Sequence, residues 1–117
     1  MKQLIFHVAN PNDAASIGDN NAYHTASLET EGFIHCCTAE QLPGVLQRYY
    51  ADIEQVVLLS LNGDALTCDL VMENTVGGTE LFPHAYGKIN SEAILEAKPL
   101  GRAEMDAVAR SEVYHPQ

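Results

Sequence analysis

The sequence predicts an α+β fold in a single domain, in which helices flank a bent or split mixed β-sheet. The chain has 117 residues, a length typical of one domain, so we expect residues 1–117 to form a single domain. Hydrophobicity patterns predict about five to seven short strands and two well-defined helices. These elements do not alternate regularly along the sequence, which argues against a doubly wound parallel sheet.

The N-terminal third begins with a strand-like segment. Residues 3–8 are mostly apolar, and Asn10-Pro11 ends this segment. A second short apolar strand is predicted at residues 32–36, where the chain enters through a glycine. Between these strands lie a weak helical turn (13–17), a loop (18–21) and a polar stretch without a clear preference (22–28).

A helix is predicted at residues 39–51. Thr38 and Gln41 match a capping box, in which each side chain bonds the backbone N–H of the other residue. Apolar side chains follow at helical spacing, at positions 42, 45, 46 and 49. Pro43 and Gly44 are unfavourable inside a helix. The helix is therefore either kinked there, or it restarts with Pro43 in its first turn.

Short strands dominate the rest of the chain. Residues 56–61 are a continuous apolar run, which is typical of a strand covered on both faces. Residues 69–73 alternate polar and apolar side chains and predict another strand. The other predicted elements are turns (62–64 and 76–78), a strand (79–82), two strands or turns (85–89 and 93–97) and a C-terminal helix (103–113).

Composition and charge limit the classes of partner. Hydrophobic residues make up 46% of the chain, so an ordered core is expected rather than disorder. The 16 acidic residues outnumber the 6 basic ones, which gives a formal net charge of −10. Such a field repels phosphate backbones and anionic membranes. We therefore expect a small-molecule ligand and neither a nucleic acid nor a membrane as partner, with the oligomeric state left open.

The cysteines and the N-terminus indicate a cytoplasmic protein. Cys36 and Cys37 are adjacent and Cys68 is an odd third, which is not a disulfide framework. Reduced thiols are typical of cytosolic proteins. The N-terminal apolar run is too short for a signal peptide, and no stretch approaches the ~20 apolar residues of a membrane helix.

Three histidines lie at the ends of predicted strands, namely His7, His35 and His84. Pockets form where strand ends meet helix N-termini, and imidazole is the side chain best suited to exchange a proton near neutral pH. We therefore expect a histidine-centred pocket built from residues 32–35 and 82–87. Each of these histidines can equally be a core residue whose ring is satisfied by a backbone carbonyl.

Two further candidates have competing interpretations. Cys37 shares its strand face with His35 and lies beside the start of a helix, which makes it a weak candidate nucleophile. Zinc bound by His35 and Cys37 with His7 or His84 is an alternative, although this spacing is not that of the usual zinc sites. Glu73 is either a solvated acid at a strand end or a carboxylate that holds a ribose hydroxyl or stabilises a developing cation.

Arg48 and Tyr86 complete the candidate set. Arg48 is the only basic residue in the central motif region, so it is either the anchor for an anion or a surface residue. Tyr86 is followed by a glycine, and it either stacks on a ligand or packs in the core.

Several segments occur in the order found in one protein family. They are residues 4–8, 27–38 (with Gly32-Phe33-Ile34-His35), 41–50, 57–59, Glu73 and Phe82-Pro83-His84-Ala85-Tyr86-Gly87. Over residues 4–97 the chain resembles the small bacterial family catalogued as domain of unknown function 952. Many members of that family carry Ser at the position of Cys37, which bears on any mechanism that needs a hydroxyl there.

The family is similar in fold to the ADP-ribosyltransferase superfamily. The resemblance implies an ADP-ribosyltransferase-like fold with NAD as the candidate cofactor. It implies that His7 contacts the ribose, that His35 with Cys37 and Thr38 lines the nicotinamide side, and that Glu73 or His84 takes the late catalytic position. The catalytic candidates are thus His35, Glu73 and His84. The ligand-binding candidates are His7, Cys37, Thr38, Arg48 and Tyr86.

Three functions remain open from the sequence. The first is an NAD-dependent transferase or hydrolase, in which nicotinamide leaves through a ribosyl cation that a carboxylate stabilises. The second is a non-enzymatic domain that binds a small molecule. The third is a metal- or thiol-dependent enzyme.

Overall fold

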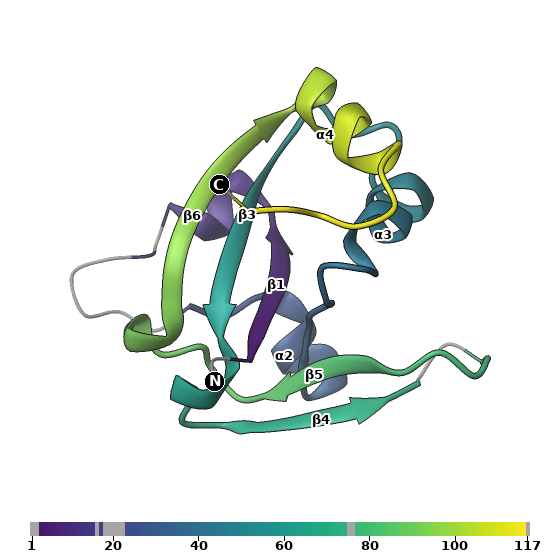
Figure 1. Ribbon diagram of the computed structural model, residues 1–117. Coiled ribbons are helices and arrows are strands. Elements are labelled where there is room, and N and C mark those ends of the chain that lie inside the picture. Colours follow the sequence, from purple (N-terminus) through teal and green to yellow (C-terminus); the bar gives the residue numbers. More distant parts are fainter. Residues whose placement is uncertain (1–2, 16, 18–22, 75–76, 117) are drawn as a thin grey trace.

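Two three-stranded β-sheets form the framework of the protein (Figure 1). The computed structural model describes residues 3–15, 17, 23–74 and 77–116. The first sheet contains, in spatial order, β1 (Leu4–Ala9), β3 (Gln55–Asn62) and β6 (Ile94–Gly101). The second sheet contains β2 (Ile34–His35), β5 (Phe82–Tyr86) and β4 (Asp69–Glu73).

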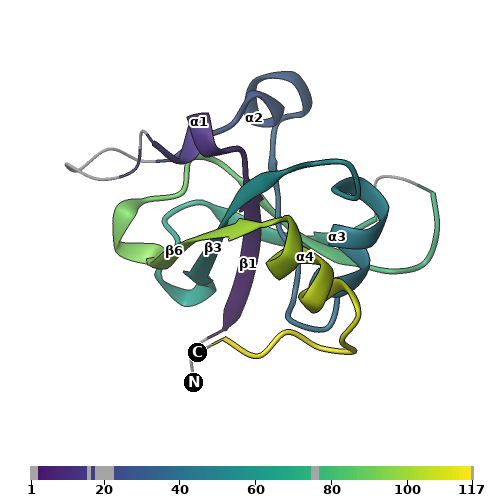
Figure 2. The same cartoon turned by 90° about the horizontal axis from the view of Figure 1, so that it is seen from above.

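Four α-helices accompany the sheets. They are α1 (Pro11–Ala14), α2 (Ala26–Glu31), α3 (Leu42–Tyr49) and α4 (Arg102–Ala109), and 3₁₀ turns occur at η1 (Gly63–Ala65) and η2 (Ser91–Ala93). Figure 2 shows α3 and α4 next to each other, away from α1 and α2. The predicted α+β class and the split sheet are confirmed. The prediction of a mixed sheet, with both parallel and antiparallel strands, is wrong, because every strand pair in the described part of the chain is antiparallel.

A short crossing of the chain joins the two sheets. Directly after β2, the N–H of Cys37 donates to the carbonyl of Phe6 at 2.8 Å, and the N–H of Phe6 donates back to the carbonyl of Cys37 at 2.8 Å. His7 follows Phe6 directly in the first sheet, and His35, at the end of β2, lies two residues before Cys37. The bridge therefore brings two of the three expected pocket histidines to the junction of the sheets.

The central strand β3 is buried on both faces, as its apolar run predicts. Leu59 and Leu61 belong to one core cluster, whereas Val56 and Leu58 belong to a second. Side chains alternate along a strand, so the two sets point to opposite faces of the first sheet. The first cluster lies against the second sheet, since it includes Ile34 of β2.

The start of α3 follows the capping box. The N–H of Thr38 donates to Gln41 Oε1 at 3.0 Å, and the N–H of Gln41 donates to Thr38 Oγ1 at 3.3 Å. Regular helix begins only at Leu42, with Pro43 in its first turn. Of the two alternatives, the restart at Pro43 is therefore correct, and the predicted helix 39–51 is too long at both ends.

The strand predicted at 79–82 and the end predicted for the C-terminal helix at residue 113 are wrong, since α4 ends at Ala109. No strand forms at residues 79–81, because side-chain amides donate hydrogen bonds to the backbone carbonyls there. Asn74 Nδ2 donates to the carbonyl of Glu80, and Gln41 Nε2 donates to that of Leu81. The polar stretch without a clear preference leads into α2, which is capped by Thr25. The predicted loop at 18–21 lies outside the described residues, as does the first position of the predicted turn at 76–78.

None of the helices in the described segments has both the length and the apolar character needed to cross a lipid bilayer.

Candidate functional site

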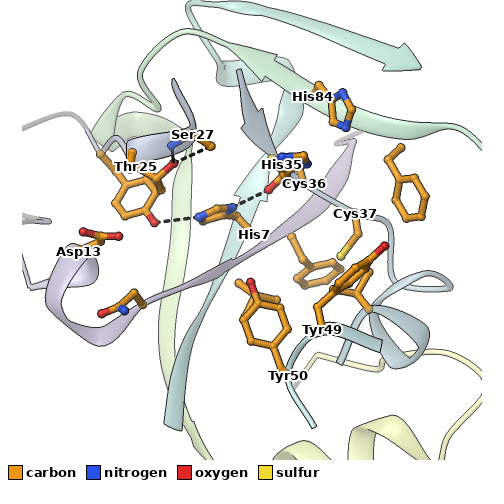
Figure 3. Close-up of a pocket in the computed structure, with 17 residues that line it drawn as sticks. His7, Asp13, Thr25, Ser27, His35, Cys36, Cys37, Tyr49, Tyr50 and His84 are labelled. Atoms are coloured by element: carbon orange, nitrogen blue, oxygen red, sulfur yellow. Dashed lines mark hydrogen bonds between the residues drawn. The ribbon is translucent and has the colours of Figure 1, made fainter. Parts of the chain in front are cut away.

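A cavity of about 500 Å³ opens at the junction of the two sheets (Figure 3). His7, His35 and His84 all line it, so the three histidines that the sequence singles out do reach one cavity. The wall is rich in aromatic rings and contains, besides the histidines, Phe6, Tyr23, Tyr49, Tyr50 and Phe82. A volume of this size falls within the range of small-molecule sites, which is roughly 300–1,000 Å³.

His7 has both ring nitrogens bonded inside the protein. Nδ1 lies 2.6 Å from the carbonyl oxygen of His35, and Nε2 lies 2.8 Å from the hydroxyl of Tyr23. A carbonyl can only accept, so Nδ1 carries the proton and Nε2 accepts from the Tyr23 hydroxyl. Burial lowers the pKa of His7 to about 4, which keeps the ring neutral at neutral pH. His7 therefore fixes the cavity wall and has no free nitrogen for a ligand.

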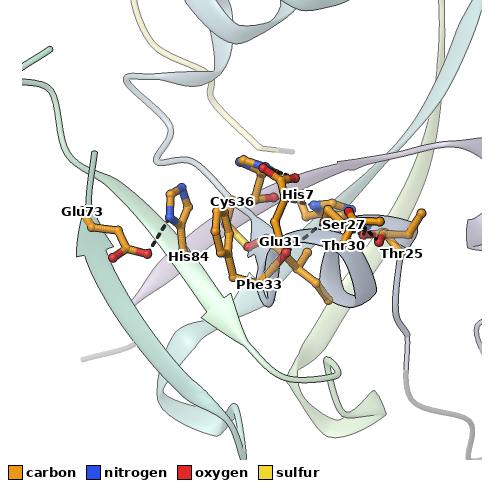
Figure 4. Close-up of polar contacts among 12 residues, drawn as sticks. His7, Thr25, Ser27, Thr30, Glu31, Phe33, Cys36, Glu73 and His84 are labelled. Carbon is orange, nitrogen blue, oxygen red and sulfur yellow. Dashed lines mark hydrogen bonds and ion pairs between the residues drawn. The ribbon is translucent and has the colours of Figure 1, made fainter. Parts of the chain in front are cut away.

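His84 is held by a carboxylate on the neighbouring strand (Figure 4). Its Nδ1 lies 2.9 Å from Glu73 Oε2, and the Tyr86 hydroxyl donates to the same carboxylate oxygen. The hydrogen bonds from Tyr86 and His84 hold the pKa of Glu73 below its ordinary value, so the carboxylate is ionised. An ionised carboxylate accepts, which places a proton on Nδ1 of His84. Nε2 has no partner among the described residues, and the ring forms part of the cavity wall.

A phenyl ring supports His84 from one side. Phe33 stacks on His84 with ring centroids 4.3 Å apart and planes inclined by 16°. Gly32, which ends α2 in the left-handed conformation at φ 89°, turns the chain into Phe33. Ser27 Oγ then donates to the carbonyl of Phe33 at 2.9 Å. The position of His84 is thus set by Glu73 at one ring edge and by Phe33 on one face.

His35 forms a second histidine–carboxylate pair beside the first. Its Nε2 lies 3.1 Å from Glu31 Oε2, and its ring centroid is 5.2 Å from that of His84. The His35 side chain is 48% exposed, whereas that of His84 is 3% exposed. Two imidazoles with different solvent access, each bonded to its own carboxylate, therefore lie next to each other at the cavity.

The remaining predicted site residues divide into two groups. Cys37 lines the cavity, but burial raises its pKa to about 12, so the thiol stays protonated. The predicted stabilisation of a thiolate is wrong, because α3 begins only at Leu42. Thr38 does not line the cavity and serves as part of the helix cap. Glu73 and Tyr86 stand behind His84 rather than in the cavity wall, and Arg48 lines a shallower neighbouring cleft.

Several other wall residues were not among those predicted from the sequence. Tyr23, Thr25 and Ser27 come from the polar stretch at 22–28, which had no assigned structure. The pair Thr25 and Ser27 was detectable as a helix N-cap, since Thr25 Oγ1 accepts from the N–H of Ser27 at 3.2 Å. Tyr23 and Asp13 carry no local signal, because only the tertiary fold brings them to His7.

Charge and ligand chemistry restrict what the cavity can hold. Among the described residues that line it, none is Lys or Arg, and Asp13 is the one acidic side chain. No group of three or more His, Cys, Asp or Glu side chains in the described segments is placed to hold a metal ion. The surroundings suit an uncharged ring compound, with the free nitrogens of His84 and His35 as the polar groups that orient it.

Comparisons with known proteins agree with the fold. A Caulobacter crescentus protein of known crystal structure, CC0527, has a TM-score of 0.70 to this chain, with 22% identity over 85% of each chain. A double mutant of the same protein gives a TM-score of 0.70 with 21% identity over 85% of each chain. At this identity the likeness establishes the fold alone. No curated protein matches significantly.

The family model described as protein of unknown function (DUF952) matches residues 8–97. The match includes both histidine–carboxylate pairs and the phenyl ring of Phe33 that stacks on His84. Because it spans most of the chain, it establishes membership, and the protein belongs to the DUF952 family.

Proposed function

We propose that the protein binds a small, uncharged ring compound in the cavity and transfers protons to and from it through His84. The observation that carries this proposal is the Glu73–His84 pair, with Nδ1 bonded to the carboxylate and the ring on the cavity wall. A carboxylate fixes the tautomer of an imidazole and stabilises the imidazolium that forms when Nε2 takes a proton. Because the His84 ring is buried and bonded to Glu73, its Nε2 atom points in one fixed direction.

His35 supplies the complementary acid. When His35 is protonated, its Nε2–H is directed to Glu31 and its Nδ1–H is free to donate. The two rings lie 5.2 Å apart, which allows one ligand to contact both nitrogens. With one nitrogen of each ring facing the ligand, one imidazole acts as base while the other acts as acid. The reaction class is general acid–base chemistry on a small molecule.

An NAD-dependent reaction is the second candidate, and the implied ADP-ribosyltransferase-like fold is its basis. In its favour, His7, His35 and Cys37 line the same cavity, as the resemblance implies. Against it, a pyrophosphate needs cationic or backbone donors, and the described wall contains neither Lys nor Arg. A non-enzymatic binding domain would use the same wall without turnover. The protonated Cys37 thiol argues against a thiol-dependent enzyme.

The acidic surface also supports a small-molecule partner over a nucleic acid or a membrane, given the net charge of −10. A cytoplasmic location belongs to the same proposal, because the three cysteines are free thiols.

Para-nitrophenyl acetate is a suitable probe, because it is a small uncharged ring compound and an imidazole promotes its hydrolysis most strongly when the ester is bound beside the free ring nitrogen. The wild-type protein is compared with His84→Gln, Glu73→Gln and, as a control, His24→Gln, whose side chain is exposed and outside the cavity. We expect His84→Gln to lower the protein-dependent rate by about 100-fold and Glu73→Gln by about 10-fold. His24→Gln should leave it unchanged. Equal rates for all four proteins would reject the proposal.

The same proteins distinguish the alternatives. Benzamide and nicotinamide, added at millimolar concentration, should shift the NMR signals of His84 and Tyr23 in the wild type. Binding of these amides without any hydrolysis that depends on His84 would favour a non-enzymatic domain. Release of nicotinamide from NAD, lost in His35→Gln, would instead establish the NAD-dependent reaction.

A further inference from the structure

A second, shallower cleft of about 300 Å³ adjoins the cavity. Tyr49 and Phe82 line both, so these two rings form a shared wall. Phe82 and His84 are two positions apart on β5 and point to the same face, roughly 7 Å from each other. A short substituent on a ligand ring bound beside His84 could therefore reach the second cleft.

Arg48 lines this cleft as an exposed cation, and none of the described carboxylates forms an ion pair with it. Its guanidinium carbon lies 5.9 Å from the centre of the Tyr49 ring, and its Nη2 lies 3.4 Å from the position that a Cβ would take at Gly44. It forms neither an ion pair nor a hydrogen bond with any residue in the described segments. Arg102, by contrast, is bonded to Asp106 and to backbone carbonyls.

Arg48 is one of only 6 basic residues in a chain that has 16 acidic ones. The described wall of the main cavity offers no Lys or Arg, so an anionic group on a ligand would find its cation only at Arg48. Glu80 also lines the second cleft and opposes an anion, although Gln41 Nε2 donates to its carboxylate at 3.2 Å. A site with one free guanidinium and one such carboxylate suits a single negative charge rather than a polyphosphate.

From this arrangement we infer that the ligand is bipartite. An uncharged ring occupies the histidine cavity, and a short arm carries one anionic group past Tyr49 and Phe82 to Arg48. This inference rests on the proposed function, since it takes the ring to be bound beside His84. Carboxylate and phosphate monoester share the required chemistry, and the probes separate them.

Hydrocinnamate and its uncharged amide provide a matched pair, with a phenyl ring and a short arm. Dissociation constants are measured by NMR titration for the wild type, Arg48→Gln, Glu80→Gln and Arg110→Gln. Arg110 is exposed and lines neither cavity, so Arg110→Gln makes the same change in net charge elsewhere. Phenethyl phosphate, tested in parallel, reports whether a phosphate monoester is preferred to a carboxylate.

We expect the wild type to bind the anion about fivefold more tightly than the amide, as for a partly exposed ion pair. Arg48→Gln should abolish this preference while leaving amide affinity unchanged, Glu80→Gln should increase it, and Arg110→Gln should preserve it. Salt at about 1 M should suppress it, because charges are then screened within ~3 Å. If the amide binds but the anion is not preferred, or if the preference survives Arg48→Gln, the bipartite ligand is wrong and the proposed function stands. If neither compound perturbs His84, both are wrong.

Discussion

The buried neutral histidine predicts how stability depends on pH. Burial lowers the pKa of His7 from 6.5 to about 4 in the folded protein. Between these two pH values the unfolded chain binds a proton at this position and the folded protein does not. The contribution of His7 is therefore fully present above pH 6.5, and it is lost progressively as pH falls towards 4.

The size of this loss follows from the same two values. Each pH unit in the interval costs about 1.4 kcal/mol, so lowering the pH from about 7.5 to about 5 should remove about 2 kcal/mol from the free energy of unfolding. That is a large share of the stability of a small domain, which is roughly 5–15 kcal/mol. Urea unfolding followed by circular dichroism at the two pH values measures it directly.

Other groups titrate over the same interval, so variants isolate the contribution of His7. His7→Asn keeps an N–H near the position of Nδ1 but cannot be protonated, and it should lose about 2 kcal/mol less than the wild type between the two pH values. His24→Asn, which changes an exposed histidine, should behave as the wild type does. The reasoning fails if His7→Asn and the wild type lose the same free energy, because His7 would then not be a buried neutral ring.

Three changes test the framework around the site, each by urea unfolding at neutral pH. Thr38→Ala removes the oxygen that accepts from the N–H of Gln41 and should cost about 1 kcal/mol; a neutral result would mean that the cap adds nothing. Gly32→Ala should also cost about 1 kcal/mol, because its φ of 89° strains any side chain; nothing lies within 4 Å of the new methyl group, so a much larger loss would point to a clash instead. Leu59→Ala, which truncates a fully buried side chain of β3, should cost about 2–5 kcal/mol. A loss below about 1 kcal/mol would show that neighbouring side chains fill the cavity.

Local patterns in the sequence were enough to predict the elements that depend on local interactions. The strand at residues 69–73 has the predicted bounds, and the apolar run 56–61 lies inside β3. The capping box at Thr38 and Gln41 forms as its residue types require. Each of these signals is contained within a few consecutive residues, so no knowledge of distant partners was needed.

The strand predicted at residues 79–82 was misplaced, because the true position of β5 depends on partner strands that are distant in the sequence. Proline is disfavoured inside a central strand because it has no backbone N–H to donate, yet Pro83 is the second residue of β5, the central strand of the second sheet. In the structure β5 continues through Pro83, because its carbonyl accepts from the N–H of Cys36 at 3.0 Å, just beyond the end of β2. Because β2 ends at His35, it has no strand carbonyl opposite Pro83 that would need a backbone N–H donor. A sequence read locally contains no information about where the partner strand ends.

The same distinction explains which parts of the site were predictable. His7, His35 and His84 were selected because each was predicted to end a strand, and strand ends converge in many folds. That prediction is correct only for His35, because His7 lies inside β1 and His84 lies inside β5. Their different roles were not predictable, because those roles depend on groups from other elements. Tyr23 and the carbonyl of His35 occupy both nitrogens of His7, whereas Glu73 occupies only one nitrogen of His84.

Because their ring nitrogens are bonded differently, the two buried histidines have different roles. His7 lies in the first sheet and bonds the backbone at His35, directly beside the bridge between Phe6 and Cys37. It therefore helps to fix the second sheet, with β5 and His84, against the first. His84 keeps Nε2 unpaired on the wall of the cavity that this junction creates. A change at His7 should consequently alter both stability and the reactivity of His84, whereas a change at His84 should alter reactivity with little effect on how the sheets are joined.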